Sequence, residues 1–91
     1  MNYTVYISGE AEKVMKKWKK SNPRMLKKFQ AIVHELGIHP REGTGHPEPL
    51  KGGNDITYSR RLSAHDRVIY DVMDDIITVL VITVEGHYKD K

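Results

Sequence analysis

The sequence predicts an α+β fold, with an N-terminal helix hairpin packed on one face of an antiparallel sheet of four to five strands. Three observations predict it: a short alternating segment opens the chain, two segments of helical period follow, and three strand-like segments fill the second half. The 91 residues suffice for a single domain, residues 1–91, and contain no cysteine. We therefore expect one modest core without disulfides or thiolate metal sites.

The first predicted elements are a strand and a helix. Residues 2–7 (NYTVYI) alternate, with Tyr3, Val5 and Ile7 on one face, which is typical of a strand. Ser8 can then cap a helix, because its side-chain oxygen can accept a bond from a free backbone N–H of the first turn. The helix is predicted by apolar residues at positions i, i+3, i+4 and i+7, namely Ala11, Val14, Met15 and Trp18.

A second helix is predicted to begin where Asn22 can act as the cap and Pro23 can occupy the first turn. Its apolar face continues through Met25, Leu26, Phe29, Ile32, Val33 and Leu36. Gly37 then ends it, as glycine commonly does at helix C-termini. Two consecutive helices with a short connection form a hairpin.

The outer faces of both predicted helices are basic. They carry Lys13, Lys16, Lys17, Lys19, Lys20, Arg24, Lys27 and Lys28. One interpretation is a solvated face, which is the ordinary place for charged side chains on an amphipathic helix. The other interpretation is a patch that faces phosphate groups.

Residues 37–54 are predicted to form a long loop, because they contain five glycines and three prolines and show no periodicity. Three further strands are predicted at 56–62, 67–73 and 76–84, separated by short turn-like segments. Short turns favour an antiparallel meander. The last strand is apolar on both faces, so we place it centrally in the sheet. The face that the helices leave uncovered is then available for function.

Several function classes find no support in the sequence. His34 and Glu35 lack the second histidine of a zinc-protease helix, Asp74 and Asp75 stand alone, and segment 43–53 lacks the Gly-Lys-Ser/Thr run of a nucleotide-binding loop. We predict no metal and no cofactor. The first 20 residues lack the apolar run of a signal peptide, and the longest apolar stretch, residues 76–84, is only long enough for a strand, so we expect a soluble, cytoplasmic protein with no membrane partner. The net charge of +3 is a mild bias toward anionic partners such as nucleic acid.

The remaining candidates are acids, bases and arginines. Glu48 lies between Pro47 and Pro49, whose rings hold the segment extended and the carboxylate stiffly placed. The alternative for Glu48 is an ordinary exposed loop glutamate. His87 and Tyr88 follow the central strand and offer an imidazole and a phenol for proton transfer or base stacking, or form an unremarkable C-terminal pair.

Arginines occur on two of the predicted strands. Arg60 and Arg61 are adjacent, so their side chains point to opposite faces and one of them must reach the uncovered face. Arg67 begins the next strand. An arginine on a sheet face is usually a salt-bridge partner, but its planar fork of donors is also suited to bind a phosphate.

Three segments together resemble a known family: GTGHPEPLK (43–51), YSRRLSAHDRVIYDV (58–72) and GHYKDK (86–91). They are similar to the YoeB/Txe family of the RelE superfamily of toxins from bacterial toxin–antitoxin systems. The resemblance spans nearly the whole chain and implies a RelE-like, microbial-ribonuclease-like fold. It departs from the commonest pattern between Lys51 and Tyr58 and in the three residues after Tyr88.

The resemblance also implies an activity and a set of site residues. It implies an mRNA interferase, a ribosome-dependent endoribonuclease that cuts mRNA in the ribosomal A site without a cofactor. Its partner is a YefM/Axe-like antitoxin, and a homodimer is left open. The catalytic residues carried over by position are Glu48 as general base, Arg67 as the phosphate-stabilising group, His87 as general acid and Tyr88 as the aromatic that positions the substrate. Lys51 and Arg61 correspond to supporting substrate-binding positions.

The chemistry of RNA agrees with this assignment. The 2′-hydroxyl can attack the adjacent phosphorus if a base takes its proton, an acid protonates the leaving 5′-oxygen and a cation stabilises the phosphorane. Two alternatives stay open: a non-enzymatic ParE-like toxin that inhibits DNA gyrase, which does not need the Glu/Arg/His set, and a basic RNA-binding module that works through the lysine-rich helices.

Overall fold

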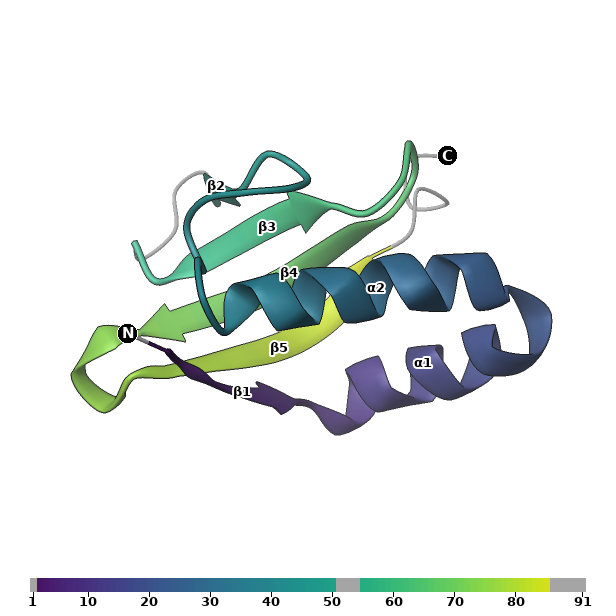
Figure 1. The fold of residues 1–91 in the computed structure, drawn as a ribbon, viewed down its shortest axis with the longest axis horizontal. Helices are drawn as coiled ribbons and strands as arrows, with labels where there is room; N and C mark the ends of the chain where they lie inside the picture. Colours follow the sequence, from purple (N-terminus) through teal and green to yellow (C-terminus); the bar gives the residue numbers. More distant parts are fainter. Residues whose placement is uncertain (1, 51–54, 86–91) are drawn as a thin grey trace.

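The computed structural model describes residues 2–50 and 55–85. Its elements, in chain order, are β1 (Thr4–Ile7), α1 (Gly9–Ser21), α2 (Pro23–Leu36), β2 (Glu48–Pro49), β3 (Thr57–Arg61), β4 (Arg67–Met73), the 3₁₀ turn η1 (Asp74–Ile76) and β5 (Thr78–Glu85). The strands form one five-stranded sheet in the order β1-β5-β4-β3-β2 (Figure 1).

The predicted helix hairpin is confirmed, and so are its caps. The Ser8 hydroxyl oxygen accepts a bond from the Ala11 N–H at 3.1 Å and caps α1. The Asn22 side chain accepts from the Met25 N–H at 3.3 Å and caps α2, which carries proline in its first turn. α2 ends at Gly37, as predicted. Each cap satisfies one of the backbone donors that the first turn of a helix leaves free.

The predicted strands are present, but β1 and β3 are shorter than predicted, β5 is shifted and one further strand is present. β4 has the predicted bounds, but residues 37–54 are not entirely loop, because Glu48–Pro49 forms β2 and pairs antiparallel with β3. β5 begins two residues later than predicted. The chain forms η1 first, and Ile77 then adopts a left-handed backbone with φ 48°, which breaks the extended conformation.

The predicted fold class is confirmed, with one change at the edge of the sheet. β1 runs parallel to β5, so the sheet is mixed rather than antiparallel throughout. β5 lies between β1 and β4, which agrees with its apolar side chains on both faces, but the central strand is β4 and not β5 as predicted. Parallel strands cannot be joined by a tight turn, and both helices and three strands lie between β1 and β5 in the chain.

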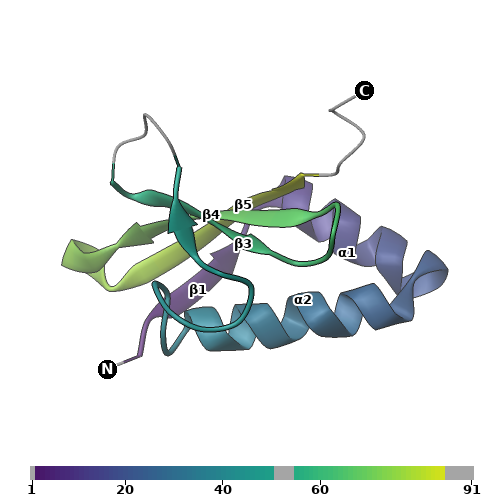
Figure 2. The same ribbon diagram turned by 90° about the horizontal axis from the view of Figure 1, so that it is seen from above.

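The core lies between the helices and one face of the sheet. The buried side chains of α2 pack against those of β4 and β5, namely Phe29, Ile32 and Leu36 against Val68, Tyr70, Val72, Val79 and Val81. Both helices lie on the same side of the sheet, and no helix within the described residues covers the opposite face, which we call the uncovered face (Figure 2). The eight basic residues of the helices are all exposed. In the described ranges, neither helix is long and apolar enough to cross a membrane.

Candidate active site

The strand register brings three of the predicted site residues to the uncovered face. Glu48 of β2 is paired with Ser59 of β3, and Arg61 of β3 is paired with Arg67 of β4. Directly paired residues share a face, and so do residues two apart on a strand. Glu48, Ser59, Arg61 and Arg67 therefore all lie on the face opposite the helices.

These side chains line one small hollow of about 40 Å³. Its walls are Gly45, His46, Glu48, Ser59, Arg61 and Arg67. Glu48, Arg61 and Arg67 are exposed, and no ion pair within residues 2–50 and 55–85 neutralises either arginine. Two guanidinium groups paired across neighbouring strands repel each other, so an anion between them is stabilised. The hollow thus combines an anion-binding pair with a carboxylate that can accept a proton.

The two adjacent arginines of β3 separate as the sequence requires, and Arg61 is the one that reaches the uncovered face. Arg60 points the other way and is fully buried. It forms a salt bridge with Glu35 of α2. Burial raises the pKa of Glu35, but hydrogen bonds from Thr44 and then from Arg60 outweigh it and hold that pKa below its usual value. Glu35 is therefore a charged structural partner.

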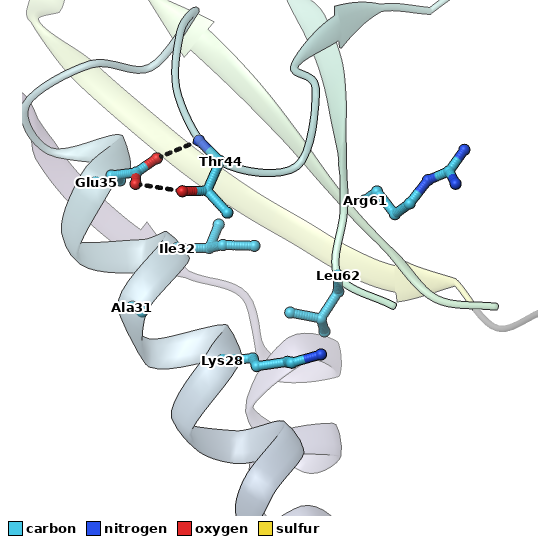
Figure 3. A pocket seen from close by; sticks show the side chains of 7 residues that line it. All are labelled: Lys28, Ala31, Ile32, Glu35, Thr44, Arg61 and Leu62. Atoms are coloured by element: carbon cyan, nitrogen blue, oxygen red, sulfur yellow. Dashed lines mark hydrogen bonds between the residues drawn. The ribbon is translucent and has the colours of Figure 1, made fainter. Parts of the chain in front are cut away.

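A second hollow of about 210 Å³ lies between α2 and the end of β3. It is lined by Lys28, Ala31, Ile32, Glu35, Thr44, Arg61 and Leu62 (Figure 3). Figure 3 shows the Arg61 side chain directed away from Leu62 and Lys28. Both carboxylate oxygens of Glu35 accept bonds from Thr44, at 2.9 and 2.8 Å. This larger hollow is mostly apolar and offers no free acid–base pair, so the smaller one is the better candidate site.

The sequence analysis did not single out His46, which lines the small hollow. His46 has φ 52°, a left-handed backbone that non-glycine residues seldom adopt. It stands two residues before Glu48, and the alternation of an extended segment could have placed both side chains on one side. The signal was therefore present in the His-Pro-Glu spacing.

Three predicted site residues, Lys51, His87 and Tyr88, lie outside the described residues. The last residue of β5, Glu85, is the register partner of Arg67. Within the described part of the chain, no group of three or more His, Asp or Glu side chains is arranged to hold a metal ion.

Comparison with known proteins identifies the family. The sequence model described as "YoeB-like toxin of bacterial type II toxin-antitoxin system" matches residues 8–88. The chain belongs to the YoeB-like toxin family. It is 35% identical to "Toxin YoeB" of Escherichia coli O6:H1 over 71 residues, which cover 78% of this chain and 82% of that toxin.

Two solved structures of Staphylococcus aureus YoeB have the same fold as this YoeB-like toxin. One is described as a YoeB dimer; it has a TM-score of 0.81 and 26% identity and covers 97% of this chain and 100% of that one. The other is described as a YoeB-YefM complex; it has a TM-score of 0.78 and 27% identity and the same coverage. The YoeB-like chain thus keeps the family's two helices packed on a mixed five-stranded sheet.

Proposed function

We propose that this YoeB-like toxin is a ribosome-dependent mRNA endoribonuclease. The observation that carries the proposal is the paired Arg61 and Arg67, which share a hollow with Glu48 on the uncovered sheet face. An extended RNA strand needs an open surface rather than a deep pocket, and a scissile phosphate needs cations on its oxygens with a base nearby. Family membership supports the same activity.

Each described residue has a role in this proposal. Glu48 takes the proton of the ribose 2′-hydroxyl, and the 2′-oxygen then attacks the adjacent phosphorus. Arg67 and Arg61 donate hydrogen bonds to the non-bridging oxygens, whose negative charge grows in the phosphorane. The reaction requires no metal ion in principle, because the nucleophile belongs to the substrate and the arginines supply the positive charge.

His87 completes the reaction as the general acid. The bond from phosphorus to the 5′-oxygen breaks as His87 donates a proton to that oxygen, which leaves a 2′,3′-cyclic phosphate and a 5′-hydroxyl. Tyr88 stacks on a base beside the cut, and Lys51 adds a further cation. Arg67 is the register partner of Glu85, the last residue of β5, so β5 ends beside the hollow. The position of Glu85 supports the assignment of His87.

The partners follow from the family and the activity. We propose an antitoxin partner, as in the S. aureus YoeB-YefM complex, that covers part of the basic surface with an acidic segment ordered on binding. A homodimer is a further proposal, motivated by the S. aureus YoeB dimer. The substrate is mRNA in the ribosomal A site, so the protein acts in the cytoplasm.

The test is cleavage of a defined mRNA on translating ribosomes, mapped by primer extension. The wild type is expected to cut within codons, and Glu48→Gln is expected to lower the cleavage rate by about 10²- to 10⁴-fold, because it removes a general base of similar shape. A message with a 2′-deoxy sugar at the cut site should resist cleavage, since it lacks the attacking hydroxyl.

The matched control is Glu12→Gln, an exposed glutamate on α1. It removes the same charge far from the hollow and should leave the cleavage rate unchanged. Equal cleavage by wild type and Glu48→Gln would refute the assigned base. Intact mRNA together with inhibited DNA gyrase would instead support the ParE-like alternative.

A further inference from the structure

Arg60 has an environment that its position on a strand does not explain. Its side chain is fully buried, and every N–H of its guanidinium group has an acceptor. The acceptors are the Tyr70 hydroxyl at 3.3 Å, the Glu35 carboxylate, and the backbone carbonyl oxygens of His39, Glu42 at 2.6 Å and Thr44 at 3.4 Å. Three of these acceptors belong to the loop between α2 and β2.

Two further groups fix the same loop. The Tyr70 hydroxyl donates to the Pro40 carbonyl oxygen at 2.8 Å. Burial raises the pKa of Tyr70, so the hydroxyl keeps the proton that this bond requires. Glu35 accepts from the Thr44 N–H and hydroxyl, as Figure 3 shows. The loop between α2 and β2 is therefore bound from the core side of the sheet. Tyr70 binds it at Pro40, and Arg60 binds it at three further carbonyl groups.

The anchored loop leads directly into the candidate active site. Gly45 follows the last anchored residue, and its carbonyl oxygen accepts from the Arg61 N–H at 2.6 Å. Gly45 has φ 86°, and a Cβ there would collide with the Arg61 backbone. His46 and Glu48 come next and line the hollow. The segment 45–48 is therefore bound to the Arg61 backbone at Gly45 and directly follows Thr44, whose carbonyl oxygen accepts from the buried guanidinium.

We propose that Arg60 is a positioning residue that holds Glu48 against Arg61 and Arg67 without touching the substrate. β2 contains only two residues, so its own pairing gives Glu48 little support. Its place depends on the loop before it, and that loop depends on Arg60. This inference rests on the proposed ribonuclease function for its kinetic part, whereas the anchoring of the loop can be tested without substrate.

Arg60→Lys tests the proposal, because lysine keeps the charge but cannot reach five acceptors arranged around a planar fork. The exchange rate of the Arg61 amide proton should rise, since its acceptor Gly45 moves. On programmed ribosomes, kcat should fall by about 10- to 100-fold with little change in KM, the result expected when a catalytic group is misplaced and binding survives.

Two further variants distinguish a displaced Glu48 from a general loss of protein stability. Val79→Ala leaves a hole in the core under β5, away from the loop, and should lower Tm while kcat stays at the wild-type value. Gly45→Ala should displace the same segment with the guanidinium in place, and so lower kcat even if Arg60→Lys does not fold.

Two results would be decisive. A protected Arg61 amide with wild-type kcat in both Arg60→Lys and Gly45→Ala overturns the inference. Absence of cleavage by the wild type overturns the proposed function instead, while the exchange rate still reports whether Arg60 anchors the loop.

Discussion

Arg60 and Arg61 are neighbours on β3 and carry the same side chain, but they lie in opposite environments. Arg60 points into the core side of the sheet, has no exposed surface and donates to acceptors in three separate segments. Arg61 points to the uncovered face, is exposed and lines the hollow with Glu48. Because successive side chains of a strand point to opposite faces, one arginine binds groups inside the protein and the other faces the candidate site.

The comparison shows what makes a cation available to a ligand. A guanidinium whose five donors are all bound inside the protein has none left for phosphate, and removing it exposes unpaired partners. A guanidinium that faces another arginine across the sheet, and that forms no ion pair within the described part of the chain, gains from an anion. Burial and pairing decide between the two roles, and the residue type does not.

The largest expected effect is on stability. Arg60→Met keeps the volume but removes every donor, and we expect it to lower the free energy of unfolding by about 3 kcal/mol, because it leaves Glu35 and buried carbonyl groups unpaired. Arg61→Met should change it by less than about 0.5 kcal/mol, as exposed substitutions usually do. Urea unfolding followed by circular dichroism measures both, and equal losses in the two variants would contradict the comparison.

The sequence predicted the elements that local signals define. The bounds of β4 and the caps Ser8 and Asn22 follow from alternation and from cap chemistry, and the structure confirms them. Glu48, Arg61 and Arg67 were predicted as site residues, and their lining of a single hollow agrees with that prediction. Their catalytic roles remain predictions.

The rest depends on contacts between distant segments. β2 has two residues, one of them proline, and only its pairing with β3 makes it a strand. The parallel pair of β1 and β5 joins strands that have both helices and three other strands between them in the chain. The burial of Arg60 requires acceptor carbonyl groups that lie about 20 residues away in the chain. The Arg-Arg pair in the sequence therefore shows that the two side chains point to opposite faces of the sheet, but it does not show which of them is buried.

The second expected effect is on activity, and here we expect the substitution of Arg61 to have a direct effect on the reaction. Arg61→Met should lower kcat/KM for mRNA cleavage by about 10- to 100-fold, the value of one charged hydrogen bond to a phosphate oxygen. Arg24→Met is the control, since it removes an exposed cation of α2 outside the hollow. If both variants lose activity equally, general attraction by the basic helices explains binding, as in the RNA-module alternative.

The smallest expected effect compares two ion pairs, the part-buried Arg60–Glu35 pair and the exposed Arg41–Asp74 pair, in which the Arg41 Nη2 and Asp74 Oδ2 atoms lie 2.8 Å apart. Hydrogen bonds from Arg41 and then from Tyr3 hold the pKa of Asp74 below its usual value, and the pKa of Glu35 is also lowered. A carboxylate whose pKa is lower in the folded state stabilises the fold above its unfolded pKa, near 4. That stabilisation is lost as the pH falls through the folded pKa.

Glu35→Gln and Asp74→Asn should therefore each lower Tm at pH 7, and each difference from the wild type should shrink as the pH is lowered below about 4. The loss should be smaller for Asp74→Asn, because solvent and salt screen an exposed pair. Added sodium chloride at about 0.5 M should reduce the Asp74→Asn difference and leave most of the Glu35→Gln difference. Calorimetry at several pH values and salt concentrations measures these Tm differences. If salt does not reduce the Tm difference of Asp74→Asn, the greater exposure of the Arg41–Asp74 pair does not distinguish it from the Arg60–Glu35 pair.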